Sequence, residues 1–348
     1  MLSSVTSTQV ISYAIIDPII SQNVNLKFSK IDKKKNFDQS YKTLWGYFEQ
    51  EIKWNNVILL GVMHLYTLKI FLMLRPEIWH LIVWGLFCGS IGGFGVTAGV
   101  HRYFTHRCFK ANLPLRIILM LAFSSSGQNT IYDWVRDHRV HHKFSETDAD
   151  PHNAKRGFFF AHCGWLMLKK HPDVVTKGKI VDCSDLLNDP VVLFQQRYFL
   201  PLKLLFCFVI PVIIPVYFWG WEVGGCIDAA IGKWVLLLNC TWSVNSVAHL
   251  WGTKPYNKEI SPVESRTVSF LSMGEGWHNY HHTFPWDYKA AELSYSWNIT
   301  TFFIDVFAKM GWAYDLRQPS LDLVERVARK AGDGSHFKWG HNVVEEHE

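Results

Sequence analysis

The sequence contains no Cys-x-x-Cys pair, and its seven cysteines form an odd and scattered set at positions 88, 108, 163, 183, 207, 226 and 240. Secreted domains held by disulfides usually carry an even number of cysteines at short, regular spacings. The cysteine pattern therefore argues against a disulfide framework and fits buried, reduced thiols.

A strong charge excess is also missing, because 35 Lys and Arg face 30 Asp and Glu and the net charge is only +5. Charge this modest is poor evidence for nucleic-acid binding, and no nucleic-acid partner is expected. The first 40 residues lack a short apolar core followed by a small-residue cleavage site. We therefore expect residues 1–40 to form a mobile tail that is retained, and residues 336–348 to form a C-terminal tail.

Apolar residues, in contrast, make up 49% of the chain, with 24 Phe and 16 Trp. A helix that spans a bilayer needs about 20 mostly apolar residues. Four stretches meet or approach this length, at residues 57–74, 79–98, 198–219 and 231–251. The sequence predicts an all-α integral membrane protein with four transmembrane helices and one domain over residues 41–335. A soluble helical protein with long core helices is the alternative, which the paired stretches and short connections disfavour.

The cations predict the orientation of these spans. Seven lysines precede the first span. The short connections around 75–78 and 220–232 together contain a single Lys or Arg residue, Arg75. The segment 101–197 and the residues after 252 are rich in Lys and Arg. Positive residues stay in the cytosol, so we expect both termini and the central segment there, as a helical cap.

Histidine is the most unevenly distributed residue, with 17 copies concentrated in three motifs. These are His101-Arg-Tyr-Phe-Thr-His106, His138-Arg-Val-His141-His142 and His278-Asn-Tyr-His281-His282. On a helix, residues i, i+3 and i+4 share a face, so each His-x-x-His-His motif is expected to direct three imidazoles one way. His101 and His106 are five apart and cannot share a face of a straight α-helix, so we expect them to bracket the end of the second span. His249 ends the fourth span, and Asn245 lies one turn before it.

Nine histidines could thus meet at the membrane surface and bind metal, since neutral imidazole suits Fe, Zn, Cu and Ni. Nine ligands are too many for one ion but fit two. We expect an all-nitrogen site, unlike the carboxylate sites of ferritin-like proteins. Two redox metals beside a membrane predict oxygen chemistry on a lipid, and the spacing alone does not separate desaturation from hydroxylation. The other histidines are expected on the surface or in the core, at positions 64, 80, 152, 162, 171, 336, 341 and 347.

The three motifs and their surroundings resemble the histidine boxes of membrane fatty-acid desaturases. The resemblance to animal acyl-CoA desaturases, most closely the insect ones, extends from about residue 40 to 335. It rests on Thr97–His101, on Asn129 through Asp150-Pro-His-Asn, on Arg156–Phe160, on Asn245–His249 and on Gly274–Tyr288. One departure is Trp277, where the family usually has Phe, and it should alter packing beneath the third motif but not ligation.

The resemblance implies a di-iron centre that uses O2 to remove two hydrogens from adjacent methylenes of a long-chain acyl-CoA. The implied ligands are His101, His106, His138, His141, His142, His249, His278, His281 and His282, with Asn245 acting through a water. Electrons are expected from cytochrome b5 and its NADH-dependent reductase, as separate proteins, because no His-Pro-Gly-Gly haem motif occurs. The implied location is the endoplasmic reticulum membrane.

A CoA head group needs cations near the cytosolic mouth, for which Arg136, Lys169 and Lys170 are candidates. The two lysines could instead anchor an interfacial helix. The resemblance adds Asn129 and Asp137 as contacts to CoA or pantetheine, and Trp242 and Thr241 as residues that shape a bend in the acyl channel. Gly85 and Gly89 could leave room for the methyl end of the chain, although helix packing explains them equally well.

Three other functions are compatible with clustered histidines. A lipid hydroxylase or ketolase would use similar motifs and differ in its product. A metal transporter or zinc-bound receptor would place ligands at mid-membrane depth, whereas these lie at span ends. A bis-histidine haem protein would leave most of the nine unexplained. The sequence favours the desaturase over all three.

Overall fold

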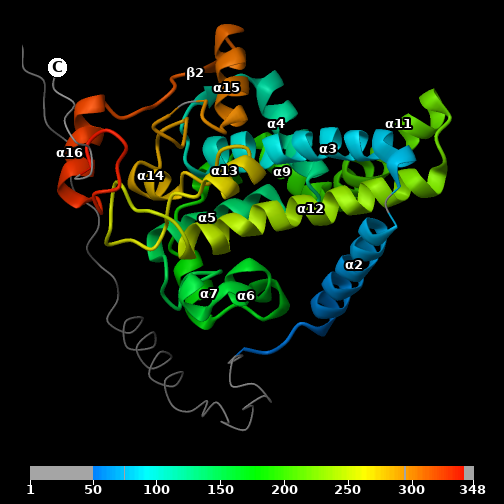
Figure 1. The fold of residues 1–348 in the computed structure, drawn as a ribbon, viewed down its shortest axis with the longest axis horizontal. Helices are drawn as coiled ribbons and strands as arrows, with labels where there is room; N and C mark the ends of the chain where they lie inside the picture. The colour runs from blue at the N-terminus through cyan, green and yellow to red at the C-terminus, as the bar shows by residue number, and fades with distance from the viewer. Residues whose placement is uncertain (1–49, 74, 294, 341–348) are drawn as a thin grey trace, which may run out of the picture. The chain divides into compact units, whose positions relative to one another are not determined.

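The computed structural model describes residues 50–340 with the exception of 74 and 294 (Figure 1). The predicted N-terminal tail, residues 1–40, and residues 341–348 of the predicted C-terminal tail lie outside the described residues. The described chain is mainly helical, with one short pair of strands. The predicted all-α class is confirmed.

Four helices in the described part are long and apolar enough to span a membrane, as predicted. They are α2 (Trp54–Leu72), the continuous η1–α3–η2 (Pro76–Ile78, Trp79–Phe94, Gly95–Thr105), the continuous α10–η5–α11 (Phe199–Lys203, Leu204–Val209, Ile210–Trp219) and α12 (Val223–Leu250). Two predicted limits were wrong. The second span continues to Thr105 instead of ending at 98, and the fourth begins at Val223 instead of 231.

The short connections carry residues that end and begin helices. Pro76 is the first residue of η1. An N–H at this position would have no partner within the helix, so proline costs no hydrogen bond there. α11 ends at Gly220, whose φ of 66° is the left-handed conformation that glycine adopts without strain. The Glu222 carboxylate then caps α12 by accepting the N–H groups of Gly224 and Gly225.

The fourth span is longer than predicted because its two charged residues have partners. Lys233 is buried, and its ammonium donates to the carbonyls of Ser125 at 3.2 Å and Cys207 at 3.0 Å. Ser125 ends helix α4 (Leu113–Ser125), so its carbonyl has no partner within that helix. Tyr66 of α2 donates to the Asp228 carboxylate at 2.6 Å. These contacts allow a helix of 28 residues with a charge near its middle.

The remaining helices are short, and several gather at one end of α3 and α12 (Figure 1). They are α5 (Ile131–Phe144), η3 (Ala154–Arg156), α6 (Phe158–His162), η4 (Gly164–Met167), α7 (Pro172–Gly178), α8 (Ser184–Leu187), α9 (Pro190–Arg197), α13 (Arg266–Leu271), α14 (His278–Thr283), α15 (Ile299–Lys309) and α16 (Leu321–Ala331). The strands β1 (Lys110–Ala111) and β2 (Ala313–Tyr314) pair antiparallel, with Lys110 opposite Tyr314.

The packed chain continues past the predicted domain limit at residue 335. His336 is buried, its Nε2 lies 2.8 Å from Oε2 of Glu292, and its ring stacks on Trp339. The domain therefore extends at least to these residues, and His336 is a histidine satisfied in the core.

Candidate metal centre

The nine predicted histidines converge in the structure, where they form two groups. Within each group, one nitrogen of every ring lies within 4.8 Å of the others. The first group contains His101, His106, His138, His142 and His281, and the second contains His141, His249, His278 and His282. Rings from four separate stretches of chain therefore meet in one place.

Each His-x-x-His-His motif contributes to both groups. In α5, His138 and His142 enter the first group and His141 enters the second. Residues four apart on an α-helix differ by only about 40° in direction, whereas adjacent residues differ by about 100°. The prediction that all three rings point one way was therefore wrong in detail. In α14 the division is reversed, with His278 and His282 in the second group and His281 in the first.

His101 and His106 share the first group although they are five residues apart. The segment between them, η2, is a π-helix, and the His106 N–H donates to the His101 carbonyl at 3.2 Å. A π-helix pairs residues i and i+5, so five-residue spacing repeats on nearly the same face. As expected, the two histidines bracket the end of the second span, because the widened helix ends at Thr105 and His106 follows it directly.

The ring nitrogens approach one another in a way that hydrogen bonding alone does not explain. In the first group, His281 Nε2 lies 3.0 Å from His101 Nε2 and 3.1 Å from His142 Nε2. A neutral imidazole has one N–H, so three mutually close nitrogens cannot all be paired. Two nitrogens about 2.1 Å from one ion and about 90° apart are themselves about 3.0 Å apart. The spacing fits rings that share a metal.

The second group repeats this spacing, with His278 Nε2 at 3.0 Å from His249 Nε2 and 3.1 Å from His282 Nε2. In the first group, the Nε2 atoms of His106 and His138 are buried with no hydrogen-bond partner among the described residues. Unpartnered buried nitrogens are rare unless an ion or water completes them. Both groups therefore fit a metal-bound state.

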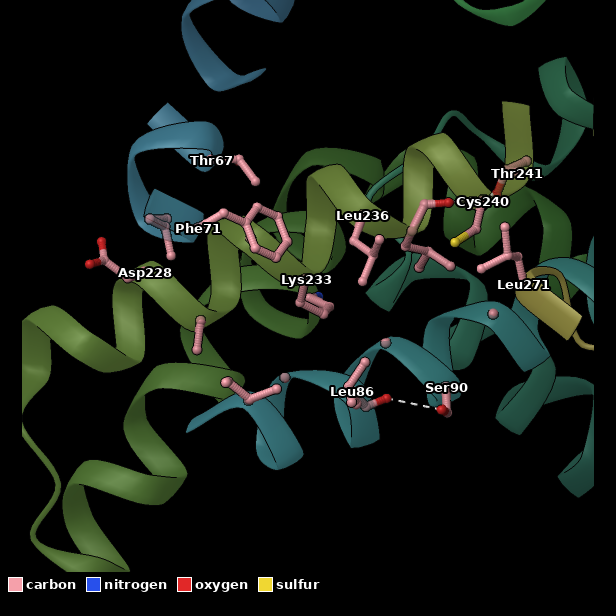
Figure 2. Close-up of a pocket in the computed structure, with 18 of the residues that line it drawn as sticks. Thr67, Phe71, Leu86, Ser90, Asp228, Lys233, Leu236, Cys240, Thr241 and Leu271 are labelled. Atoms are coloured by element: carbon pink, nitrogen blue, oxygen red, sulfur yellow. Dashed lines mark hydrogen bonds between the residues drawn. The ribbon is translucent and has the colours of Figure 1, made fainter. Parts of the chain in front are cut away.

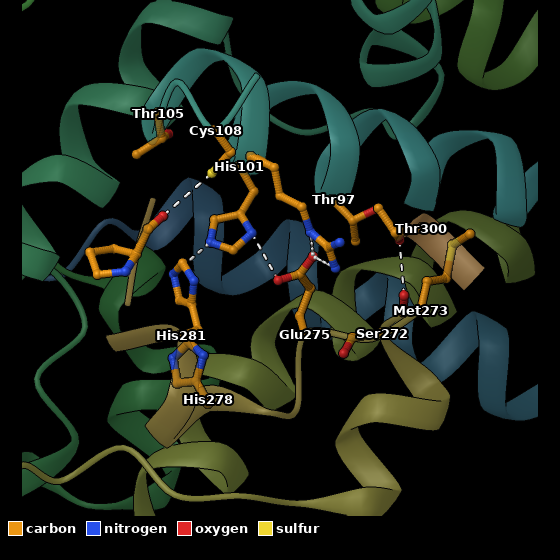
Figure 3. Close-up of polar contacts among 12 residues, drawn as sticks. Thr97, His101, Thr105, Cys108, Ser272, Met273, Glu275, His278, His281 and Thr300 are labelled. Carbon is orange, nitrogen blue, oxygen red and sulfur yellow. Dashed lines mark hydrogen bonds and ion pairs between the residues drawn. The ribbon is translucent and has the colours of Figure 1, made fainter. Parts of the chain in front are cut away.

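Three buried carboxylates contact histidine rings on the side that faces away from the two groups. They were not predicted from the sequence. Each lies against the Nδ1 atom of one histidine, which places the proton there and leaves the Nε2 lone pair directed into the group. Figure 3 shows His101 held between Glu275 on one side and His281 on the other. The pairs are Glu275–His101 at 2.8 Å, Asp150–His141 at 3.0 Å and Glu146–His249 at 2.7 Å.

Glu275 stands three residues before His278, which is the Glu-x-x-His spacing of carboxylate di-iron proteins. Its carboxylate contacts His101 and Arg102 instead of entering either histidine group. The described geometry therefore agrees with the expected all-nitrogen arrangement.

Burial keeps most of these rings neutral. It lowers the pKa well below the ordinary histidine value, with neighbouring rings adding to the effect, at His106, His138, His142, His278, His281 and His282. His141 differs, because the Asp150 carboxylate outweighs burial and raises its pKa. Neutral imidazole is the form that binds metal, so six rings are ready to do so at pH 7.

Arg102, which follows His101 directly, is fully buried and connects the first group to the segment from Tyr288 to Thr301. Its guanidinium donates to Glu275 at 3.0 and 2.9 Å, to the Tyr288 carbonyl at 3.0 Å, to Thr301 at 3.0 Å and to Asn298 at 3.1 Å. Burial acts to raise the pKa of Glu275, but Arg102 and His101 lower it, so this carboxylate is ionised. The pair fixes Glu275 as the partner of His101.

An apolar cavity of about 890 Å³ begins at the histidines and extends between α2, α3 and α12. Its lining includes His101, His138 and His278 at one end and Arg75 and Glu222 at the other. Figure 2 shows Leu86 and Ser90 of α3 facing Lys233, Leu236 and Cys240 of α12 across this space. A long apolar chain placed here would lie against the metal centre.

Three predicted substrate residues line this cavity, namely Gly85, Gly89 and Thr241. Asn245, which was predicted to act on the metals through a water, also lines it. A Cβ at Gly89 would lie 3.4 Å from the Lys233 side chain, an ordinary contact. A Cβ at Gly92 would instead lie 2.8 Å from Leu237 and 3.1 Å from the Ser126 backbone. Gly92 thus serves helix packing, whereas Gly85 and Gly89 line the cavity and have room for a Cβ at ordinary contact distance from α12. The role of Asn245 through a water stays a prediction.

Thr241 is linked to the first histidine group through two residues that the sequence analysis missed. Gln128 donates to the Thr241 hydroxyl at 2.9 Å and accepts from the Trp134 indole at 3.0 Å. Trp134 stacks on His138 with ring centres 4.9 Å apart. Trp242 lies elsewhere. It is buried against α2 and α6 and is not among the cavity-lining residues.

The predicted CoA contacts are partly brought together. Arg136 and Lys170 both pair with the Asp137 carboxylate, Arg136 at 3.0 Å. Lys169 pairs with Glu51 at 2.6 Å instead. Lys53, which the sequence analysis missed, lies near this cluster, and burial together with Lys170 lowers its pKa. Asn129 accepts the N–H of Thr130 at 2.9 Å beside the start of α5.

A family model described as fatty acid desaturase matches residues 76–298, which include all nine histidines. The chain belongs to the fatty acid desaturase family. It is therefore an enzyme, an oxidoreductase, and the family is metal-dependent. The histidine groups are the part of this desaturase that suits a metal.

The desaturase is similar over most of its length to curated relatives. It is 50% identical over 297 residues to the acyl-CoA Delta-9 desaturase of Acheta domesticus, covering 84% of this chain and 82% of the relative. It is 48% identical to the acyl-CoA Delta(11) desaturase of Trichoplusia ni, with 82% and 83% covered. It is 45% identical to human stearoyl-CoA desaturase, with 86% and 84% covered. The predicted resemblance, including its insect members, is confirmed.

Trp277 replaces the phenylalanine expected from the resemblance and gains a specific contact. Its indole N–H donates to the Ser296 carbonyl at 2.9 Å. Phenylalanine has no such donor, so the substitution attaches the start of α14 to the loop before α15 without entering the histidine groups.

Proposed function

We propose that this desaturase introduces a double bond into a saturated long-chain acyl-CoA, using two iron ions, O2, and electrons from cytochrome b5 and its NADH-dependent reductase. The observation that carries the proposal is the position of two convergent histidine groups at one end of a long apolar cavity. Relatives at 45–50% identity are named acyl-CoA desaturases.

In this proposal the nine histidines hold the two irons, and Asn245 acts through a water. Iron would supply the one-electron and O2 chemistry that amino-acid side chains lack. Glu275, Asp150 and Glu146 orient three of the rings by their Nδ1 atoms, so that the lone pairs stay directed inward. The protein's remaining task is to place one pair of methylenes against the metals and exclude water.

The CoA group would bind where Arg136, Lys170 and Lys53 gather around Asp137, with Asn129 nearby. Guanidinium and ammonium groups are suited to CoA phosphates. Lys169 faces Glu51 and would contribute charge only. The acyl chain would continue past the metals, where Thr241 forms part of the channel wall.

We further propose a location in the endoplasmic reticulum membrane with both termini in the cytosol. The basis is the excess of Lys and Arg in segments 101–197 and after 252 compared with the short connections. The histidine groups, at the ends of η2 and α12, would then lie at the cytosolic surface, where a soluble haem domain can reach them.

Expression in a yeast strain that lacks its own desaturase tests the function. We expect growth without added unsaturated fatty acid and new alkenes in lipid extracts, located by mass spectrometry after derivatisation, with two iron equivalents in the purified protein. An empty vector is the control. A hydroxylated product without an alkene would instead assign a lipid hydroxylase.

Gly89→Leu is expected to shorten the acyl chains that the enzyme accepts, because the new side chain enters the cavity beside Lys233. Each excluded methylene in an apolar pocket is worth about 10-fold or more in specificity, so the preference should shift clearly toward shorter chains. Competition between acyl-CoAs of different length measures this shift. Gly61→Leu is the matched control, since a Cβ there meets nothing within 4 Å. An unchanged length preference in Gly89→Leu would show that the chain does not pass Gly89.

A further inference from the structure

Two histidines outside the metal centre, His64 and His162, belong to a series of hydrogen-bonded polar side chains beside the mainly apolar helix α12. Asn239 of α12 lies between them, with its Nδ2 3.0 Å from His64 Nε2 and its Oδ1 3.1 Å from His162 Nε2. His162 Nδ1 then lies 2.9 Å from the Ser246 hydroxyl, two turns further along α12. The sequence analysis had placed both histidines among the surface or core residues.

The partners fix the direction of the hydrogen bonds that Asn239 and His64 make. Asn239 Nδ2 also donates to the Val235 carbonyl at 2.8 Å, so its Oδ1 must face His162 and accept. His64 Nδ1 lies 2.7 Å from the Leu60 carbonyl and must donate, which leaves Nε2 to accept from Asn239. Burial lowers the pKa of His162, so this ring is neutral and has one N–H.

Three of these contacts form one continuous series of donors. His162 donates to Asn239, Asn239 donates to His64, and His64 donates to the backbone of α2. The Ser246 hydroxyl lies 2.9 Å from His162 Nδ1 and donates to the Trp242 carbonyl at 3.0 Å. Hydrogen bonds made in low dielectric favour one arrangement of the helices that they join.

Trp242 is enclosed by this series. Its ring stacks with His64 at a centre distance of 6.1 Å and an interplanar angle of 19°, and meets His162 edge-on at 5.8 Å. Trp242 is 4% exposed. The two histidines therefore hold the α12 face formed by Asn239, Trp242 and Ser246 against α2 and α6.

Another face of the same two turns of α12 lines the channel. Thr241 and Asn245 line the cavity, and His249 of the second histidine group lies one turn beyond Asn245. Gln128 donates to the Thr241 hydroxyl at 2.9 Å. A rotation of α12 would displace Thr241, Asn245 and His249 together, because all three are fixed to one helix.

We propose that His64 and His162 are positioning residues for regioselectivity: through Asn239 and Ser246 they fix the rotation of α12, and with it the carbon pair that faces the metals. This inference rests on the proposed desaturase function. Apolar packing between membrane helices has little directional preference, whereas interhelical hydrogen bonds select one register. The hydrogen bonds of Asn239 therefore select the rotation of α12 at the same turns that line the channel.

The test measures double-bond position in products formed from one saturated acyl-CoA, together with iron content. His64→Leu and Asn239→Leu are expected to raise the proportion of products desaturated at neighbouring positions by about 10-fold, which corresponds to ~1.4 kcal/mol of lost discrimination. His64→Gln, which restores an acceptor toward Asn239, is expected to return the distribution toward wild type. Because Asn239→Leu already removes the link to His64, the double variant should shift no further than Asn239→Leu alone.

His80→Leu is the matched control, since His80 is a histidine of α3 that contacts Trp79 and Trp221 and not Trp242. An unchanged distribution in His64→Leu and Asn239→Leu, or an equal shift in His80→Leu, would overturn the proposal. Ser246→Ala removes only one hydroxyl and serves if the Leu variants do not accumulate, and an unchanged distribution in that variant would also overturn the proposal. A wild-type protein that forms no alkene would instead contradict the proposed function itself.

Discussion

His141→Ala is expected to abolish desaturation while the protein still accumulates. His141 is one of only four rings in the second histidine group, and its removal leaves three nitrogens and takes from the Asp150 carboxylate its contact with His141. Changing a residue that merely supports a metal ligand costs about 10- to 100-fold in metal affinity or activity, so removing a ring from the group should cost more. Product analysis and metal content per chain measure the two effects.

A graded comparison separates metal binding from general damage. Asp150→Asn keeps the size of the side chain and weakens its contacts with His141 Nδ1 and with the N–H groups of Glu146 and His152, so we expect an intermediate loss. His171→Ala removes a partly exposed histidine outside both groups and should leave activity unchanged. Full activity with two metal equivalents in His141→Ala would remove this residue from the ligand set.

Arg102→Leu is expected to destabilise the protein more than other single changes outside the histidine groups. Arg102 is 0% exposed, and its loss leaves the buried Glu275 carboxylate without its cation. Breaking a buried ion pair by removing one partner costs about 3–5 kcal/mol. The midpoint of thermal unfolding in detergent should fall steeply, whereas Arg107→Leu, which breaks an exposed pair with Asp185, should change it little.

The double variant Arg102→Leu/Glu275→Leu distinguishes stability from the support of His101. Replacing both partners of a buried pair by apolar residues is often close to neutral, so part of the lost stability should return. His101 would still lack its Nδ1 partner, so activity should stay low. Recovery of activity together with stability would mean that Glu275 has no role in orienting His101.

The sequence predicted what depends on local spacing. Apolar length located all four spans, and the His-x-x-His-His repeats located the metal centre, because both patterns are contained in short windows. The start of the fourth span was placed after Asp228, because this charged residue interrupts the apolar pattern. Its partner, Tyr66, comes from a distant segment that no local pattern reveals.

The carboxylates behind the rings were missed for the same reason. Glu146 and His249 are 103 residues apart, and Glu275 and His101 are farther apart still, so their pairing depends on the tertiary fold. A local signal did exist for Asp150, which stands nine residues after His141 in the quoted Asp150-Pro-His-Asn stretch. Trp242 was expected at the channel, but the structure buries it on another face of α12.

The widened helix η2 has a consequence for how this chain can change over evolutionary time. Its residues follow a five-residue repeat, so narrowing it to α-helical turns at the same length would place His106 about 140° around the helix axis from His101. The spacing of the two histidines and the widened turn should accordingly change together in functional descendants, while the connection at Gly220 can vary in length.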